Sequence, residues 1–163
     1  MFRELRRKKQ LLSRSVAEDI LNRKSSGVLA LSGDDSYPYA VPLSYVFDGE
    51  TLCFHCAKAG HKLDAIRHSE KASFCVIDKD EVVPEEYTTY FRSVIAFGRV
   101  RILENEREKR AALEKLALKY APDSTQEERH GEIQREWPHV CVLEMKIEHM
   151  TGKEAIELVR ARP

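Results

Sequence analysis

The sequence has no excess of charge of either sign and no long apolar run. Its 27 Lys and Arg residues balance 27 Asp and Glu residues, so the formal net charge at pH 7 is zero. Proteins that grip nucleic acid by its phosphates, or that lie on an anionic membrane surface, carry a basic excess. We therefore expect neither partner. The apolar runs are shorter than the roughly 20 residues of a transmembrane helix, which argues against a membrane span.

The first ten residues are basic, with five Lys or Arg residues against one Glu. A secretory signal would continue from such a start into an apolar segment, and none follows here. The sequence therefore predicts a cytoplasmic protein with a solvated basic arm over residues 1–13. In that compartment the four cysteines would stay reduced.

Glycine, proline and tryptophan are also scarce, with 7, 6 and 1 copies in 163 residues. Fibrous and low-complexity chains are far richer in glycine and proline. With 42% hydrophobic and 33% charged residues, the composition is that of a globular protein. The length suits a single domain that buries its own core. We expect one domain over residues 1–163, with residues 154–163 as a tail.

The first predicted helix covers residues 15–24. Ser15 and Glu18 have the spacing of a capping box, in which a hydroxyl and a carboxylate satisfy free backbone amides at a helix start. Gly27 follows as a suitable stop signal. Helical periodicity also covers residues 63–69, 106–120 and 125–137, and it continues weakly in the tail.

Short apolar and β-branched runs predict strands between turn signals. Asp48-Gly49 is a strong hairpin signal, Gly98 marks a bulge, and Pro42 indicates an edge or a bulge. Residues 78–89 are acidic and are expected to be irregular. The predicted strands cover residues 28–31, 39–47, 51–56, 72–77, 91–103 and 139–147. The first three would form an antiparallel meander, and five or six such strands favour a small closed or split barrel.

The segment from Phe54 to Ile66 is the most informative for chemistry. A strand ends there, a turn of small residues follows, and a helix begins with His61-Lys62. Gly60 would let a ligand approach the backbone, and the first amides of a helix are free to bind an anion. Lys62 adds a positive charge and His61 a second donor. The segment predicts a phosphate cradle, and the alternative is an ordinary strand-to-helix loop.

Two further stretches could complete a site. Arg92-Ser93 stands at the entry to an apolar strand, where it could contact a phosphate or a ring. The alternative is an edge charge beside a solvated hydroxyl. The backbone of residues 39–45 could flank a planar ring.

The cysteines and histidines do not suggest a metal site. Cys53 and Cys56 are three residues apart in a strand, so their side chains would point to opposite faces. Cys75 and Cys141 stand alone in apolar strands, and the histidines lack ligand spacing. We therefore expect structural cysteines and no metal, although an exposed histidine could hold a haem. Trp137 would pack in the core or an interface, or it would cover a ligand.

Taken together, these segments resemble the flavin-binding split-barrel superfamily that includes pyridoxamine phosphate oxidase. The resemblance is closer to the branch of nitroimidazole-resistance (Nim-type) proteins. It covers residues 15 to 153, and four motifs carry it in the same order. They are Gly27–Leu31 with Tyr37–Tyr45, then Phe54–Asp64, then Tyr90–Gly98, and finally Ile147–Lys153. The fold it implies is mainly β with peripheral helices, an antiparallel six-stranded split β-barrel.

The resemblance implies a homodimer with flavin mononucleotide (FMN) at two interface sites. His61 and Lys62, with Gly60, would hold the phosphate, where the oxidases use an Arg-Lys pair. A histidine there would weaken phosphate binding above neutral pH if it must be charged. The ring would lie against Val41, Pro42, Leu43 and Ser44, beside Phe54, His55, Cys56 and Ala57, with Arg92 and Ser93 from the same or the other subunit. His55 is the candidate catalytic residue, and the alternative is a strand histidine with a structural hydrogen bond.

The function expected from this resemblance is an FMN-dependent oxidoreductase. It would transfer electrons from NADH or NADPH to a small oxidised molecule such as a nitroaromatic or a quinone. The substrate-binding residues near the C-terminus of the oxidases have no counterpart here, which argues against vitamin B6 oxidation. The alternatives are a flavin carrier or sensor without turnover, a haem-binding barrel, and a barrel that has lost its flavin and only binds other proteins.

Overall fold

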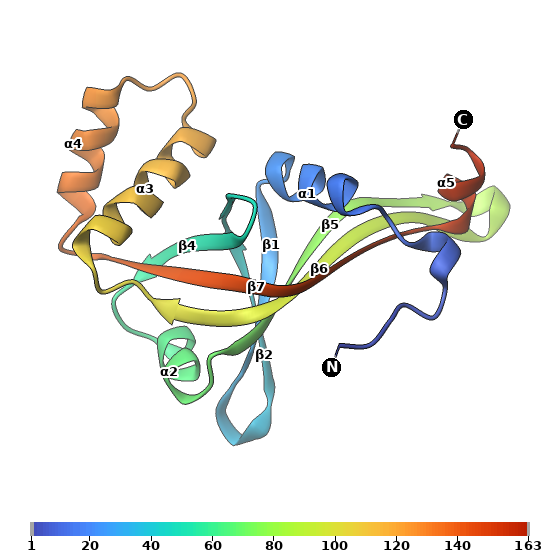
Figure 1. Cartoon of the computed structure of the whole chain (residues 1–163), viewed down its shortest axis with the longest axis horizontal. Coiled ribbons are helices and arrows are strands. Elements are labelled where there is room, and N and C mark those ends of the chain that lie inside the picture. The colour runs from blue at the N-terminus through green and yellow to red at the C-terminus, as the bar shows by residue number, and fades with distance from the viewer. Residues whose placement is uncertain (1, 163) are drawn as a thin grey trace.

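A computed structural model describes residues 2–162 of the chain (Figure 1). Seven strands form one antiparallel sheet in the order β2-β1-β5-β6-β7-β4-β3. Their bounds are β1 Ser26–Ser32, β2 Pro38–Ser44, β3 Val46–Phe47, β4 Thr51–Ala57, β5 Lys71–Val83, β6 Thr88–Ile102 and β7 Val140–Glu154. The expectation of a mainly β fold with peripheral helices is confirmed, but the strand count is seven rather than six.

The sheet curls so that its two ends meet. The end strands β2 and β3 are separated in the chain by Tyr45 alone, so chain connectivity brings the two edges together. Within residues 2–162 the hydrogen-bonded ladder does not join β2 to β3. The expected strand over 39–47 is therefore broken at Tyr45. The predicted antiparallel pairings are present, because β1 pairs with β2 and β3 pairs with β4, but the middle strand is divided, and β4 pairs with β7 on its other side.

The buried side of the curled sheet is an apolar core with three aromatic residues at its centre. Tyr45, Phe54 and Phe74 are fully buried, and the ring centroid of Phe74 lies 4.9 Å from Tyr45 and 5.1 Å from Phe54. The Tyr45 hydroxyl donates to the carbonyl of Leu21 at 2.8 Å, which satisfies its one polar atom. The break between β2 and β3 therefore lies at Tyr45, a residue that the core holds in place.

Most of residues 78–89 are extended, which corrects the expectation of an irregular loop; only Pro84–Glu86, a short 3-10 helix, and the left-handed Tyr87 form the turn between β5 and β6. β5 and β6 stay paired from Lys71 opposite Arg99 to Val83 opposite Thr88, with a bulge between Ile77 and Lys79. The acidic residues lie on a strand whose β-branched neighbours face one another across the hairpin, and β-branched residues favour extended backbone. The predicted bulge at Gly98 is confirmed by a register shift between Phe97 and Gly98.

Five α-helices within residues 2–162 flank the sheet, and α1 packs on its central strands β5, β6 and β7. Their bounds are α1 Arg14–Arg23, α2 His61–His68, α3 Glu106–Tyr120, α4 Gln126–Glu136 and α5 Ile156–Arg160. The α1 helix is capped by Ser13, whose hydroxyl accepts from the Val16 amide, so the capping box predicted at Ser15 is wrong. Gly27 does not stop this helix but lies in β1. A Cβ atom there would come within 2.5 Å of the Phe74 ring, so the chain needs glycine for close packing.

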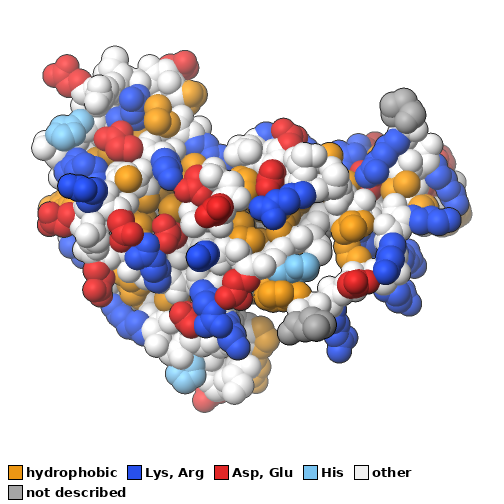
Figure 2. Space-filling model, in the orientation of Figure 1, with side chains coloured by type: hydrophobic (Ala, Val, Ile, Leu, Met, Phe, Trp, Pro, Cys, Tyr) orange, Lys and Arg blue, Asp and Glu red, His pale blue; other side chains and the backbone are white. Residues whose placement is uncertain are grey.

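The helices α3 and α4 form a second layer beside β4 and β7 (Figure 1). A smaller apolar cluster joins them, including Leu113 and Leu116 of α3, Ile133 of α4 and Val142 of β7. Within the described residues, no helix is long and apolar enough to cross a membrane. Acidic and basic side chains are intermixed over the face drawn in Figure 2, which agrees with the zero net charge of the sequence.

Candidate functional site

The end of β4 and the start of α2 form the candidate site. β4 ends at Ala57 and α2 begins at His61, with Gly60 as its N-cap residue. Gly60 has φ +128°, a backbone conformation that side chains disfavour, and nothing lies within 4 Å of where its Cβ would be. The turn therefore requires glycine and leaves open space in front of the helix.

The first turn of α2 presents backbone donors to this space. The amides of Leu63 and Asp64 both donate back to the Gly60 carbonyl, at 2.9 and 3.3 Å. The amides just before them, of His61 and Lys62, have no carbonyl within the helix to reach. A helix start also carries a partial positive charge. With the ammonium group of Lys62 beside it, this end of α2 favours an anion.

A cavity of about 160 Å³ lies at the same place. Its lining comes from β2, the end of β4 and the first turn of α2. It consists of Tyr39, Cys56, Ala57, Ala59, Gly60, His61, Lys62 and Leu63. The structure thus brings together five residues that the sequence predicted for the site and adds Tyr39, Ala59 and Leu63.

The imidazole of His61 is held by the β1–β2 hairpin. Its ring stacks on that of Tyr39 with a centroid distance of 4.1 Å, and its Nε2 lies 3.7 Å from Oδ2 of Asp34. Asp34 was not predicted for the site, and Tyr39 was predicted only as part of the backbone of residues 39–45, not through its side chain. The contact joins elements more than 20 residues apart, so no local pattern reports it. Tyr39 shares a strand face with Val41 and Leu43, and this spacing is the one signal that could have found it.

The predicted ring-lining residues divide between two faces. Val41 and Leu43 of β2 pack against the core, and Phe54 of β4 is fully buried within it. Pro42 and Ser44 alternate with them and are exposed. At β2 the side chain of Tyr39 therefore meets the cavity, whereas Pro42 and Ser44 are exposed on the opposite face of the strand.

His55 is exposed and lies opposite Val142 of β7. In a strand, neighbouring side chains alternate, so His55 shares a face with Cys53 and not with Cys56. Cys53 packs in the cluster under α3, whereas Cys56 lines the cavity. His55 thus points to the opposite face of β4 from Cys56 and does not line the cavity.

Arg92 and Ser93 do not line the cavity in the same chain. The Arg92 guanidinium donates to Glu154 at 2.8 Å and to Asp78 at 3.3 Å. Asp78 also pairs with Arg23 at 2.5 Å. Burial opposes ionisation of Asp78, but the two guanidinium groups hold its pKa below the ordinary value. This network ties the hairpin to α1 and the end of β7, while Ser93 lies on the outer face opposite Ile77 and Lys153.

Over residues 13–154 the sequence matches the protein family described as pyridoxamine 5'-phosphate oxidase. The chain belongs to the pyridoxamine 5'-phosphate oxidase family. The superfamily resemblance seen in the sequence is confirmed by this match. No curated protein sequence is similar enough to count as a match.

Solved structures share the fold of this family member. A conserved hypothetical protein from Mycobacterium tuberculosis has TM-score 0.81 and 19% identity, with 98% of this chain and 94% of that chain covered. A candidate 5-nitroimidazole antibiotic resistance protein from Bacteroides thetaiotaomicron has TM-score 0.74 and 20% identity, covering 88% and 86%. An FAD and heme binding protein from Mycobacterium smegmatis has TM-score 0.71 and 23% identity, covering 95% and 80%.

The outer face of the sheet carries a row of exposed apolar side chains. Across β2, β1, β5, β6 and β7, one row in register reads Pro42, Val28, Cys75, Ile95 and Thr151. Val28 and Ile95 are each 37% exposed, and Ile77 near them is 59% exposed. A solvated sheet face normally alternates to polar side chains. This face therefore has the composition of an interface.

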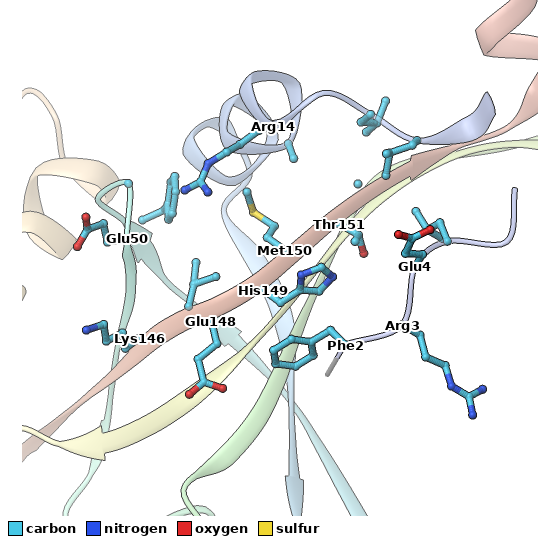
Figure 3. Close-up of a pocket in the computed structure, with 18 of the residues that line it drawn as sticks. Phe2, Arg3, Glu4, Arg14, Glu50, Lys146, Glu148, His149, Met150 and Thr151 are labelled. Atoms are coloured by element: carbon cyan, nitrogen blue, oxygen red, sulfur yellow. The ribbon is translucent and has the colours of Figure 1, made fainter. Parts of the chain in front are cut away.

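A larger cavity of about 870 Å³ lies between the N-terminal arm and β7 (Figure 3). Phe2 of the arm stacks on His149 of β7, with ring centroids 4.8 Å apart. His149 lies opposite Phe97 of β6, so the cavity borders the apolar outer face. Its size is that of a site for a small organic molecule.

Within residues 2–162, no group of three or more His, Cys, Asp or Glu side chains is arranged to hold a metal. All four cysteines are free. Cys53 and Cys56 lie on opposite faces of β4, as predicted from their spacing.

Proposed function

We propose that this chain binds FMN, with the phosphate at the start of α2, and acts as a flavin-dependent reductase. The observation that carries the proposal is the cavity in front of α2, where Gly60 opens the backbone and Lys62 supplies a positive charge. A phosphate dianion matches free helix amides and an ammonium group. The fold shared with an FAD and heme binding protein supports a flavin as the group that carries the phosphate.

The size of the cavity fits part of FMN. About 160 Å³ accommodates the phosphate and the start of the ribityl chain, but not the three-ring isoalloxazine system. The ring would therefore lie outside, over exposed side chains such as Pro42 and Ser44. When bound, FMN supplies two-electron transfer chemistry. The residues of the chain bind and orient it: Lys62 neutralises the phosphate, and His61, fixed by Tyr39, closes one side.

We further propose that the protein is a homodimer and that the second copy covers the ring. The apolar outer face, with Val28 and Ile95 exposed, supports an interface there. Pro42 belongs to the same row, so a flavin ring over β2 would lie at the edge of that interface. Arg92 and Ser93 would reach a flavin only from the second copy, because they do not line the cavity of their own chain.

The proposed reaction is the reduction of a small oxidised molecule, such as a nitroaromatic or a quinone, with NADH or NADPH as donor. The shared fold of a candidate nitroimidazole-resistance protein supports this acceptor class. His55 remains a candidate catalytic residue. A flavin carrier or sensor is the alternative, and it would bind FMN without oxidising the nicotinamide donor.

The test of the phosphate site compares two ligands on two variants. Lys62→Ala should weaken FMN binding about 10- to 100-fold, because a charge-assisted hydrogen bond contributes about 1.5–3 kcal/mol. Binding of riboflavin, which lacks the phosphate, should not change. Lys71→Ala, which removes an exposed lysine beyond the other end of α2, is the control for loss of a positive charge. Quenching of flavin fluorescence during titration measures each affinity.

Equal FMN affinity in wild type and Lys62→Ala would remove Lys62 from the site. Equal losses for FMN and riboflavin would mean that the substitution acts on the fold and not on the phosphate. Consumption of NADH or NADPH with a nitroaromatic or quinone acceptor would favour the reductase over the carrier. A flavin that neither donor can reduce would favour the carrier.

A haem is the second candidate ligand, and one observation favours it. Nε2 of His149 is buried without a hydrogen-bond partner beside the cavity of about 870 Å³. A neutral imidazole nitrogen is a common axial haem ligand. If haem binds there, His149→Ala should abolish the Soret band of the haem-loaded protein, whereas His130→Ala on exposed α4 should leave it unchanged. A Soret band that survives in His149→Ala would place the haem elsewhere.

A further inference from the structure

Two cysteines stand directly opposite each other at the end of the β4–β7 ladder. Cys56 of β4 pairs with Cys141 of β7 in an unbroken register. The Ile147 amide donates to the Glu50 carbonyl at 3.1 Å, so every second pair from there, including Cys56 and Cys141, is a hydrogen-bonded pair. The Cα atoms of such a pair are about 5.5 Å apart, within the range of about 4.4–6.8 Å for disulfides.

The two thiols are also close enough to influence each other. Cys141 contributes to the raised pKa of Cys56, and both side chains pack against the main core. The other cysteines have different partners across their ladders. Cys53 lies opposite Val46 and Glu144, and Cys75 lies opposite Val28 and Ile95. Strand register therefore singles out one pair.

A small oxidant can reach this pair through the cavity in front of α2. Cys56 lines that cavity together with Lys62, and both cysteines are only partly buried. Burial raises the pKa of Cys56 to about 11, and the nearby Lys62 charge acts in the opposite direction. Cys56 is thus a slow nucleophile that stays reduced until oxidant accumulates.

We propose that Cys56 and Cys141 are a thiol pair that a hydroperoxide converts to a reversible cross-strand disulfide. One thiolate attacks the peroxide O–O bond and gives a sulfenic acid, with loss of water or an alcohol. The second thiol attacks that sulfur, the S–S bond forms, and the sulfenic oxygen leaves as water. Two thiols lose two electrons and two protons, and one peroxide gains them. No flavin takes part, so this inference stands apart from the proposed function.

The bond would alter one wall of the cavity in front of α2. Cys56 is followed after three residues by Gly60 and then by His61 and Lys62. A disulfide would fix the end of β4 to β7 and reposition the sulfur that lines the cavity. The redox state of the pair would therefore change the shape of the candidate phosphate site.

The experiment is thiol mapping of the intact full-length protein. Reduced protein is treated with hydrogen peroxide, and the reaction is quenched. The protein is then denatured in the presence of a maleimide, which blocks free thiols, and digested with trypsin without reduction. The expected product is a cross-link between peptides 25–58 and 136–146, with the mass of the two peptides less two hydrogen atoms plus one maleimide on Cys53. Peptide 25–58 also contains Cys53, so Cys53→Ser serves to assign the link to Cys56.

The cross-link should persist in Cys53→Ser and Cys75→Ser, vanish in Cys141→Ser, and disappear on treatment with dithiothreitol. Peroxide that converts Cys56 to a sulfinic acid while Cys141 stays maleimide-labelled would overturn the proposal. A link between two copies of the chain would overturn it as well. Circular dichroism of each variant before oxidation confirms that the fold is intact.

Discussion

At the scale of residues, Gly60 contributes to the candidate site through its backbone, and Lys62 contributes through its charged side chain. Gly60 holds a φ of +128° and turns free amides toward open space. Lys62 adds the charge that makes this space favourable for a phosphate. Substituting Gly60 would strain the turn, whereas substituting Lys62 would leave the turn and remove the charge, so the two contributions are separable.

The N-cap of α1 gives a prediction at this scale. Ser13 has extended backbone, and its hydroxyl lies 3.3 Å from the Val16 amide. Ser13→Ala should therefore lower the free energy of unfolding by about 1 kcal/mol. Ser15→Ala should change it little, because the Ser15 hydroxyl contacts only that of Ser13, at 3.0 Å. Urea denaturation followed by circular dichroism checks both, and a larger loss for Ser15→Ala would contradict this cap.

Features that depend on neighbouring residues in the sequence were predictable, and features that depend on residues distant in the sequence were not. The opposite faces of Cys53 and Cys56 follow from strand geometry, and the Gly98 bulge follows from glycine in a long strand. The role of Tyr39 and the opposition of Cys56 to Cys141 depend on which strands and helices meet. The sequence favoured Ser15 over Ser13 as the N-cap residue of α1. A capping-box spacing does not show at which residue extended backbone ends and the helix begins.

At the scale of elements, α3 is joined to the β3–β4 turn by an ion pair. Nζ of Lys115 in α3 lies 2.7 Å from Oδ2 of Asp48. Asp48 also accepts from the amides of Glu50 and Thr51 and from the Thr51 hydroxyl. Burial opposes ionisation, but these donors lower the pKa of Asp48 to about 2. The carboxylate thus stabilises the fold only while it is ionised.

This pair predicts a pH-dependent effect of Asp48→Asn. Since the folded-state pKa is below the ordinary value of 3.8, the stabilisation is complete above about pH 4 and is lost as the pH falls toward 2. The variant should be less stable than wild type by about 1 kcal/mol at pH 7, as expected for a partly exposed pair. The difference should shrink between pH 4 and pH 2.

Urea denaturation at each pH measures this difference. Asp123→Asn, at an exposed acid in the loop between α3 and α4, is the control for net charge. A deficit of Asp48→Asn that stays constant from pH 7 to pH 2 would contradict the role assigned to the ionised carboxylate.

Element positions were predictable where periodicity was strong. The α1 and α3 segments and the cores of five strands lie where the sequence placed them. The extended structure of residues 78–89 was not predictable from their composition, which is acidic. It depends on the pairing of β-branched residues in β5 and β6, which is visible only once the partner strand is known. The division of residues 39–47 into β2 and β3 depends on Tyr45, whose burial is a property of the closed core.

At the scale of the whole molecule, the apolar outer face is where we propose that two copies of the chain meet. Val28 and Ile95 lie in the same row of a sheet face that a lone chain would expose to water. Ile95→Arg should convert a dimer into a monomer, because a buried unpaired charge is costly at an interface. Light scattering after size exclusion measures the mass of each species.

Leu118→Arg is the matched control, since Leu118 is 48% exposed on α3, away from that face. It should leave the dimer intact. A monomeric wild-type protein, or an Ile95→Arg variant that stays dimeric, would contradict an interface on the outer face. The strand order that creates this face was not accessible from sequence, because β4 pairs with a strand more than 80 residues away.

The central claim is that the cavity at the start of α2 holds the phosphate of a flavin. The most direct measurement is the near-ultraviolet and visible absorption spectrum of the purified full-length protein, before and after FMN addition and desalting. The account predicts the two absorption bands of protein-bound flavin in at least the second sample, retained by wild type and lost on desalting from Lys62→Ala. A wild-type protein that remains colourless after FMN addition would contradict it, and a Soret band without flavin bands would favour the haem instead.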